Sequence, residues 1–454
     1  MVTVVTLETP ELGDRTYLIH DGEQGLVVDP QRDTDRIVAL AASAQVKITC
    51  VAETHIHNDY VSGGWSLAQA VGARYLVAAA DQVSFPRQPV GEGDRVEVGS
   101  MTLQALATPG HTQSHLSFLI DSKQGPKALF SGGSLLYGAV GRTDLVSPAL
   151  AEALAHAQYR SALRLAALPP ELDLYPTHGF GSFCASGSTS ATEPEHNVGT
   201  QRFSNPALTE DEDDFVKALL AGYSEYPRYY AHMAAINLAG AAAPALGPPP
   251  EIDTAEVGRR IRDHDWVIDL RPRTEFGPSH LAGTVNFPIG DQLATYVGWV
   301  IPWGAPLTLL SSSRELVTRA RRDLARIGID GLAGWSSAPQ AELQAAHGRS
   351  SYLVTDFLGL AEAVRSEGVQ ILDARRPDEW RERHIKNSIN IHLPDLPSRL
   401  VELPDRPTWV HCAAGYRSAV AASLLDRAGR EVVLVDDDIA RLGEVGLELE
   451  SGPE

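Results

Sequence analysis

Two histidines and an aspartate stand close together at 54–59, in the segment T-H-I-H-N-D. The preceding residues, 46–52, are rich in β-branched side chains and predict a largely buried strand that ends just before this segment. Backbone geometry in the loop after such a strand can turn both imidazoles and the carboxylate toward one point. Imidazole and carboxylate ligands suit zinc or iron. The spacing therefore predicts a metal site that includes His55, His57 and Asp59.

Two more histidines follow predicted strands later in the N-terminal half. His111 stands in T-P-G-H-T after a strand at 101–106, and His178 closes a strand that begins at Asp173. Metal ligands gather on loops that a rigid sheet holds in place. We therefore expect His111 and His178 at the same site. The alternative is a retained fold whose metal site has decayed.

A different kind of chemistry is predicted near the C-terminus, in the loop C-A-A-G-Y-R-S at 412–418. This loop lies between a predicted strand at 408–411 and a predicted helix. A cysteine at such a turn faces backbone N–H groups and a helix N-terminus, which both favour the thiolate. Arg417 adds a fixed positive charge, and Gly415 lets the loop curl without steric cost. We expect Cys412 to be a reactive nucleophile rather than a buried structural cysteine.

The domains that must position these residues can be outlined from length and composition. A chain of 454 residues corresponds to about three domains. Alanine, glycine and proline without periodicity at 241–250 predict a linker. The expected domains are 1–240, 251–345 and 352–454.

The C-terminal half contains an internal repeat. Six residues recur at one constant spacing, which is hard to produce by chance. Each copy begins with a strand, and helical patterns then alternate with strands, so we expect two small α/β domains with parallel sheets. The matched pairs are Asp269 and Asp373, Arg271 and Arg375, Glu275 and Glu379, Phe276 and Trp380, His280 and His384, and Asn286 and Asn390.

The N-terminal motifs resemble those of the metallo-β-lactamase superfamily, and most closely its glyoxalase II and persulfide dioxygenase branch. The similar motifs are T-H-x-H-x-D, T-P-G-H-T, G-R-T-D at 141–144 and Y-P-T-H. The resemblance covers about residues 1–240 and implies an αββα sandwich with the site at one edge of its sheets. It also implies a small thiol or persulfide partner such as glutathione persulfide, with Arg142 as a candidate binding residue.

Two positions depart from that family pattern. The first motif usually ends in Asp-His, but Tyr60 follows Asp59 here. Gly133 stands where the family places an aspartate that bridges two metals or completes an iron site, so a two-metal site is not expected. The expected cofactor is one iron or zinc ion per chain, on His55, His57 and His111, with Asp59 and His178 nearby and a position open for water or substrate.

The loop at 412–418 resembles the active-site loop of rhodaneses, C-x-x-G-x-R-S. That resemblance implies transfer of one sulfur atom as a persulfide on Cys412, with Arg417, Gly415 and Ser418 around it. The first copy of the repeat lacks this chemistry, because Ser311 and Leu316 take the places of the cysteine and the arginine. We expect it to be a structural or docking domain.

One further departure lies in the second copy. Rhodaneses usually have glycines after the last strand, but this chain has three aspartates at 436–438. They are either simply solvated or able to repel an anionic sulfur donor such as thiosulfate.

Composition limits the partners. A formal charge of −20 argues against nucleic acid or an anionic membrane surface. The longest apolar stretches are broken by proline and glycine, and residues 1–14 show no secretory signal. Three widely spaced cysteines, Cys50, Cys184 and Cys412, do not make a disulfide framework. We expect a cytoplasmic protein with reduced thiols; its oligomeric state stays open, a homo-oligomer included.

Three functions follow from these features. The first is a sulfur-handling enzyme in which a persulfide dioxygenase-like metal domain is coupled to a rhodanese sulfurtransferase domain. The second is a metal-dependent hydrolase of a glutathione thioester, such as a hydroxyacylglutathione. In the third, the N-terminal domain is a non-catalytic scaffold and only Cys412 reacts.

Overall fold

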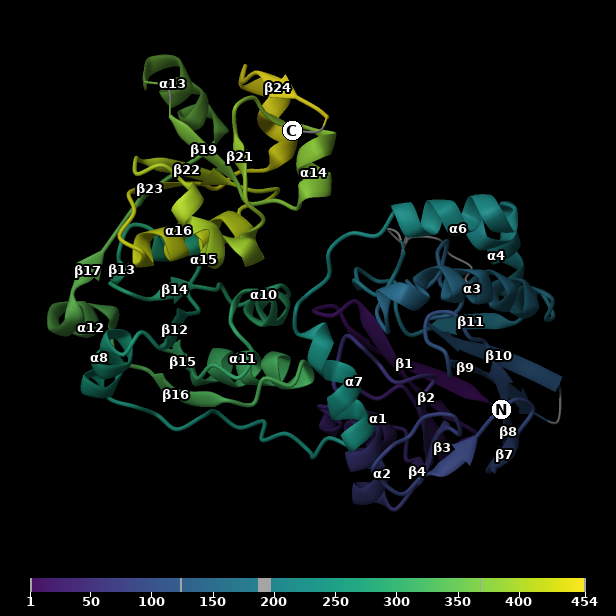
Figure 1. Cartoon of the computed structure of the whole chain (residues 1–454). Coiled ribbons are helices and arrows are strands. Elements are labelled where there is room, and N and C mark those ends of the chain that lie inside the picture. The colour runs from purple at the N-terminus through teal and green to yellow at the C-terminus, as the bar shows by residue number, and fades with distance from the viewer. Residues whose placement is uncertain (1, 123–124, 187–196, 368, 453–454) are drawn as a thin grey trace. The chain divides into compact units, whose positions relative to one another are not determined.

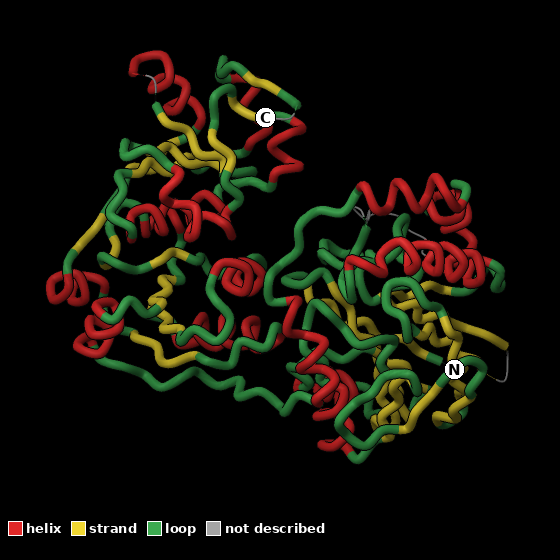
Figure 2. The backbone as a smooth tube through the Cα atoms, viewed as in Figure 1, coloured by secondary structure: helices red, strands yellow, loops and turns green. Residues whose placement is uncertain are grey.

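The computed structural model of the chain describes residues 2–122, 125–186, 197–367 and 369–452 (Figure 1). The chain divides into two compact units. Unit 1 comprises Met1–Ala245 with Ala325–Gly328, and unit 2 comprises Leu246–Leu324 with Ile329–Glu454. Figure 2 shows the strands of each unit in yellow and the helices in red.

Unit 1 contains two sheets. The first has six strands in chain order, antiparallel from β1 to β3 and parallel from β3 to β6. The second has the order β11-β10-β9-β8-β7 and is antiparallel except between β10 and β11. The strands are β1 Thr3–Thr9, β2 Asp14–His20, β3 Gln24–Val28, β4 Lys47–Ala52, β5 Arg74–Ala78, β6 Gln88–Val90, β7 Arg95–Val98, β8 Met101–Ala107, β9 Leu116–Ser122, β10 Gly125–Gly132 and β11 Asp173–Pro176.

Seven α-helices belong to the described part of unit 1 before residue 245. They are α1 Asp35–Ser43, α2 Gly64–Val71, α3 Ala151–Ala166, α4 Val198–Ser204, α5 Pro206–Thr209, α6 Glu212–Ala221 and α7 Tyr230–Ala239. In Figure 1, α3 lies beside β11, with α4 and α6 on its other side, whereas α1 and α2 lie beside β3 and β4.

The core of unit 1 consists of three apolar layers, which follow from the alternation of side chains along its strands. Tyr17 and Ile19 of β2 pack with Phe118 and Phe130 of the other sheet. Leu18 points to the opposite face, where side chains of α1 and α2 cover the first sheet. A third cluster joins the second sheet to α3, α4, α5 and α6. Two sheets face to face, with helices on both outer faces, form the predicted αββα sandwich.

Unit 2 contains two parallel sheets, one for each copy of the repeat. The first copy has the order β14-β12-β15-β16 and the second the order β18-β23-β22-β19-β21. The strands are β12 Trp266–Asp269, β14 Val285–Asn286, β15 Leu307–Leu310, β16 Leu332–Ser336, β18 Leu353–Thr355, β19 Gln370–Asp373, β21 Ile389–Asn390, β22 Thr408–His411 and β23 Val432–Val435, with the two-residue pairs β13 His280–Leu281 and β17 Arg349–Ser350, and β20 His384–Ile385 and β24 Leu449–Glu450.

The helices of unit 2 alternate with these strands, as the sequence pattern predicts. They are α8 Thr254–Arg262, α9 Arg273–Phe276, α10 Leu293–Val300, α11 Arg314–Arg326, α12 Gln340–His347, α13 Phe357–Glu367, α14 Pro377–Glu382, α15 Leu396–Arg399 and α16 Tyr416–Arg427. Residues of the predicted repeat make the same hydrogen bonds in both copies. The Nδ2 of Asn286 donates to two carbonyls of the first copy, those of residues 269 and 271, and Asn390 donates to those of residues 373 and 375.

The predicted and observed strands agree closely next to the histidine motifs and Cys412, because the sequences of those strands carry the strongest β-branched and apolar signals. Strand β1 was not predicted from the sequence. It lies at the edge of the first sheet, where most of its side chains are partly exposed and provide a weaker pattern. Among the residues that the structure describes, none of the helices has the length and apolar character needed to cross a membrane.

Candidate functional site

Four histidines meet in unit 1 where strands of both sheets end. His55 and His57 follow β4, His111 follows β8, and His178 follows β11. All four side chains are buried, and five of their ring pairs have centroids 4.1 to 5.6 Å apart. These four residues, called the histidine cluster below, are the histidines that the sequence motifs single out. The fold brings all of them together.

Three members of the cluster are held by their Nδ1 atoms. His55 Nδ1 lies 2.9 Å from Thr54 Oγ1, and His111 Nδ1 lies 2.7 Å from the carbonyl oxygen of Arg142. His178 Nδ1 lies 2.8 Å from a carboxylate oxygen of Asp14. Outer partners of this kind fix the orientation of an imidazole and leave its Nε2 free to bind a metal.

His57 is held in the opposite sense, by its Nε2 atom. That atom lies 3.0 Å from the hydroxyl of Tyr60, 3.2 Å from Glu53 Oε2 and 3.4 Å from Asp29 Oδ1. Burial alone would lower the pKa of His57, but the carboxylates of Asp29 and Glu53 raise it to about 9. Its Nδ1 atom is therefore the one left to face the cluster.

Ring nitrogens of three members of the cluster lie close enough together to hold one metal ion. His55 Nε2 and His178 Nε2 lie 3.3 Å apart. His55, His57 and His178 offer three ligand atoms within 4.8 Å of one another. His57 Nδ1 and His111 Nε2 are buried without a hydrogen-bond partner among the described residues. Buried polar atoms without partners are costly, and coordination to a metal would satisfy both nitrogens.

Two carboxylates, those of Asp14 and Asp59, lie beside the Nδ1 atom of His178. Asp59 Oδ2 lies 3.1 Å from His178 Nδ1, beside the contact from Asp14. Burial and the neighbouring charge of Asp59 raise the pKa of Asp14 to about 8, whereas the charge of His178 and its hydrogen bond outweigh burial and lower the pKa of Asp59. In this geometry Asp59, predicted among the metal residues, orients a ligand histidine. Asp14 was missed from the sequence because no motif marks it.

The glycine at 133 leaves no place for a carboxylate between two metals. A Cβ atom built on Gly133 would overlap the ring of His111. The Gly133 N–H donates to Nε2 of His115, a buried residue whose ring stacks on His55. Tyr60, at the second departure from the family motif, stacks its ring on His57 with centroids 4.3 Å apart. Tyr60 therefore fills space beside His57, and the His111 ring takes the space that a side chain at position 133 would need.

Two further residues lie at the edge of the cluster. Cys184 is buried, and its sulfur lies within 4.8 Å of ligand nitrogens of His111 and His178. Burial raises the pKa of this thiol well above its ordinary value. The side chain of Arg142, the predicted substrate-binding residue, is engaged by Asp144 at 2.7 Å through two of its nitrogens. Arg142 contacts the cluster through its backbone carbonyl oxygen, which lies beside His111 Nδ1.

The Cys412 loop of unit 2 has the predicted form. Gly415 adopts φ of +89° and caps α16, and its N–H donates to Cys412 Sγ at 3.2 Å. Ser418 Oγ lies 3.4 Å from the same sulfur. A sulfur that accepts a backbone N–H at a helix N-terminus lies in a positive field that favours the thiolate.

Arg417 is fixed by a carboxylate rather than free beside the sulfur. Its guanidinium makes a bidentate pair with Glu379, at 2.5 and 2.8 Å. Burial would lower the pKa of Arg417, but the Glu379 contacts raise it, so the guanidinium stays charged. In the first copy, Ser311 follows β15 as Cys412 follows β22, and Leu316 is more than a third exposed. The loop of the first copy, which has no cysteine, thus occupies the position that the Cys412 loop has in the second copy.

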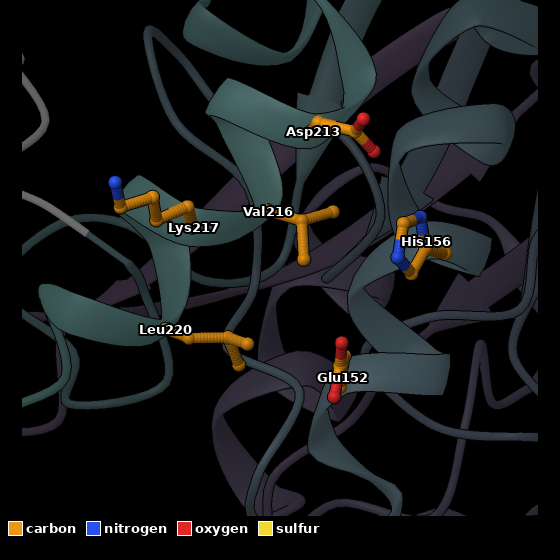
Figure 3. Close-up of a pocket in the computed structure, with 6 residues that line it drawn as sticks. All are labelled: Glu152, His156, Asp213, Val216, Lys217 and Leu220. Carbon is orange, nitrogen blue, oxygen red and sulfur yellow. The ribbon is translucent and has the colours of Figure 1, made fainter.

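A surface pocket of about 340 Å³ lies elsewhere in unit 1. Figure 3 shows that its side chains come from α3 and α6. It contains none of the predicted site residues. Its lining residues are Glu152, His156, Asp213, Val216, Lys217 and Leu220.

Two family models match separate parts of the chain. Residues 11–178 match the family model "Metallo-beta-lactamase superfamily", and residues 359–442 match "Rhodanese-like domain". The hydroxyacylglutathione hydrolase of Methylobacillus flagellatus is 31% identical over 184 residues, which cover 40% of this chain and 68% of the relative. The chain belongs to the metallo-beta-lactamase superfamily. It adds to that superfamily's domain a rhodanese-like domain that carries Cys412.

Other relatives of this metallo-beta-lactamase superfamily member bear two different enzyme names. The hydroxyacylglutathione hydrolase of Pseudomonas putida (strain GB-1) is 34% identical over 39% of this chain, and the mitochondrial persulfide dioxygenase ETHE1 of Mus musculus is 29% identical over 45% of it and 75% of its own length. The chain spans 60 to 65% of three hydroxyacylglutathione hydrolases from P. putida strains. A metallo-beta-lactamase from Staphylococcus aureus subsp. aureus COL is similar in structure, with a TM-score of 0.65, 29% identity, and coverage of 74% of this chain and 98% of its own.

Proposed function

We propose that this protein handles sulfur at two sites: a sulfurtransferase site at Cys412 and a metal site that acts on a small thiol or its persulfide, such as glutathione persulfide. The hydrogen bond from the Gly415 N–H to Cys412 Sγ, at the N-terminus of α16, carries the proposal. That position stabilises a thiolate and also the negative sulfur of a cysteine persulfide.

Sulfur transfer at Cys412 takes two nucleophilic steps. The Cys412 thiolate attacks the outer sulfur of a donor persulfide, the donor's S–S bond breaks, and the donor leaves as a thiolate. Cys412 then holds one extra sulfur atom. An acceptor thiolate attacks that atom, the new S–S bond at Cys412 breaks, and the cysteine thiolate returns. Neither step needs an oxidant, because the sulfur atom moves with its oxidation state unchanged.

At the metal site, the residues that would hold one ion are His55 and His178 through Nε2 and His57 through Nδ1. His111 also has a ligand nitrogen within 4.8 Å of one on His178. When bound, iron would supply oxygen-dependent oxidation of a persulfide, and zinc would supply hydrolysis of a thioester. The chain's own residues orient the four imidazoles and bury the site.

The thioester hydrolase is the second candidate, and the composition of the donor set favours it. Nitrogen atoms dominate the ligand positions, and Gly133 offers no carboxylate. Catalytic zinc is often held by three histidines, whereas non-haem iron in oxygenases commonly has two histidines and one carboxylate.

Metal analysis separates the candidates. We would measure bound iron and zinc in the full chain purified without added metal, in wild type and in His111→Ala. Oxygen uptake with glutathione persulfide and hydrolysis of a glutathione thioester would be measured on the same samples. About one iron per chain, lost in His111→Ala, together with oxygen uptake would support the dioxygenase. Zinc with thioester hydrolysis would support the hydrolase.

A further variant tests the sulfurtransferase site by itself. Cys412→Ser should abolish sulfur transfer to an acceptor thiol and leave the metal content unchanged. If wild type binds no metal and yet transfers sulfur, the N-terminal domain is a scaffold. If wild type carries no persulfide on Cys412 after incubation with a donor, the sulfurtransferase proposal is wrong.

A further inference from the structure

The cysteine-free copy of the repeat contributes a charged residue to the Cys412 loop. Arg273, the first residue of α9, contacts the second copy at two points. Its Nε lies 2.6 Å from Asp436 Oδ1, and its Nη2 donates to the carbonyl oxygen of Ala414 at 3.3 Å. Both contacts lie within unit 2 and flank the loop that holds the sulfur.

The carboxylate of Asp436 places a negative charge beside that loop, and this charge needs a positive partner. Its carboxylate packs against Gly415 so closely that a Cβ on this glycine would collide with Asp436 Oδ1. The N–H of the same glycine donates to Cys412 Sγ. An unpaired carboxylate at that place would repel both a thiolate on Cys412 and an approaching anionic donor.

The other two aspartates of the run 436–438 are engaged elsewhere. Asp437 pairs with Arg441 at 2.9 Å and accepts the N–H of Phe357. Asp438 accepts the N–H of Ala440 and caps the short helix that follows. The acidic run therefore puts one carboxylate against the sulfur loop, and Arg273 is the residue paired with it.

The second contact of Arg273 fixes a peptide group. The Ala414 carbonyl and the Gly415 N–H belong to one peptide unit, and in a trans peptide they point in opposite directions. A guanidinium that holds the carbonyl on one side therefore aims the N–H to the other side, where Cys412 Sγ accepts it. Arg273 thus balances the charge of Asp436 and also fixes the direction in which the Gly415 N–H donates.

We propose that Arg273 is a positioning and specificity-determining residue of the Cys412 site, which makes the cysteine-free copy part of the sulfurtransferase centre. The copy's role then includes keeping the centre open to anionic sulfur donors despite Asp436. This inference rests on the proposed function of Cys412, but its electrostatic part can be measured without any sulfur transfer.

The experiment compares two alkylating reagents that differ in charge. Iodoacetate is an anion and iodoacetamide is neutral, and both attack the same thiolate. The ratio of their rate constants at Cys412, followed by mass spectrometry of the peptide that contains it, cancels the thiolate fraction and reports local charge. In Arg273→Ala of the full chain, we expect this ratio to fall by roughly threefold to tenfold at low salt, and by less at high salt.

Three further variants sharpen the test. In Arg273→Ala combined with Asp436→Asn, the ratio should return close to wild type, because the unbalanced charge is gone. Arg273→Lys keeps the charge and should keep the ratio even if the loop is less well ordered. Arg262→Ala removes an exposed arginine of the same copy and should leave the ratio unchanged. A folded Arg273→Ala protein with an unchanged ratio, or a double variant without recovery, would overturn the proposal.

Sulfur loading separates this inference from the proposed function. Wild type and the variants would be incubated with thiosulfate, and the extra sulfur atom on Cys412 would be detected by mass. Loading in wild type that persists fully in Arg273→Ala at limiting thiosulfate contradicts the role of Arg273 alone. Absence of loading in wild type with thiosulfate and also with glutathione persulfide, with a ratio that still responds to Arg273, contradicts the sulfurtransferase and leaves the electrostatic role of Arg273 standing.

Discussion

Nε2 of His178 lies 3.3 Å from Nε2 of His55 in the buried centre of unit 1. With metal–nitrogen bonds of about 2.0–2.1 Å, two ligands of a tetrahedral ion are about 3.3–3.4 Å apart. The two histidines are 123 residues apart in the chain, and each is oriented by an outer partner on its Nδ1. The separation matches two ligands of the same ion.

Asp14 should matter for metal affinity, because it holds the ring of His178 at 2.8 Å. Asp14→Asn keeps the shape of the side chain but weakens this contact. Loss of such an outer partner typically costs about 10- to 100-fold in metal affinity. Competition with a chelator, read out by metal analysis, would measure the change. Asp94→Asn, at an exposed carboxylate, serves as the control; equal affinities in both variants would count against a role for Asp14.

Restoring the family's aspartate should not create a second metal site. In Gly133→Asp the new side chain would overlap the His111 ring, so this ring must move or the loop must distort. Overpacking of this kind costs about 1–3 kcal/mol. We expect less than one metal per chain and a lower melting temperature than wild type, with Gly133→Ala intermediate. Two metals per chain in Gly133→Asp would show that the cluster can reopen.

Gly415 should be required for the reactivity of Cys412. At φ of +89° any other residue is strained, by about 1–2 kcal/mol for alanine, and a Cβ would also collide with Asp436. We expect Gly415→Ala to slow alkylation of Cys412 by iodoacetamide. Gly429→Ala is the matched control, because Gly429 has φ of +74° with open space around it. Both variants should lose stability, but only Gly415→Ala should lose thiol reactivity.

The ionisation of Glu379 should make the free energy of unfolding depend on pH. Burial raises its pKa, but the hydrogen bonds and charge of Arg417 outweigh burial, so the pKa lies below its ordinary value of about 4.3. A lowered carboxyl pKa contributes stability above the ordinary value and loses it as pH falls through the folded value. Urea unfolding should therefore show a deficit for Glu379→Gln at pH 7 that shrinks below about pH 4. Glu382→Gln, exposed on the same helix, should show no such dependence.

The sequence alone determined most of the elements and most of the candidate site residues, because both depend on short-range patterns. A β-branched run sets a strand, and the residues that follow it must stand in the loop at its end; this placed His55, His57, His111, His178 and Cys412. The constant spacing of the repeat identified two α/β copies before any contact was known. These signals need only a few neighbouring residues, so they can be read without the fold.

Tertiary structure alone decided which residues serve the reactive ones. Asp14 reaches His178 across 164 residues, and Arg273 reaches Asp436 across 163. The vacancy at Gly133 is filled by the His111 ring rather than left for a metal-bridging group. An aspartate or arginine without a motif looks like any other surface charge in a sequence. Its role appears only when the chain's long-range folding buries it beside a partner, because the strength of an electrostatic contact depends on distance and burial in space rather than on separation along the chain.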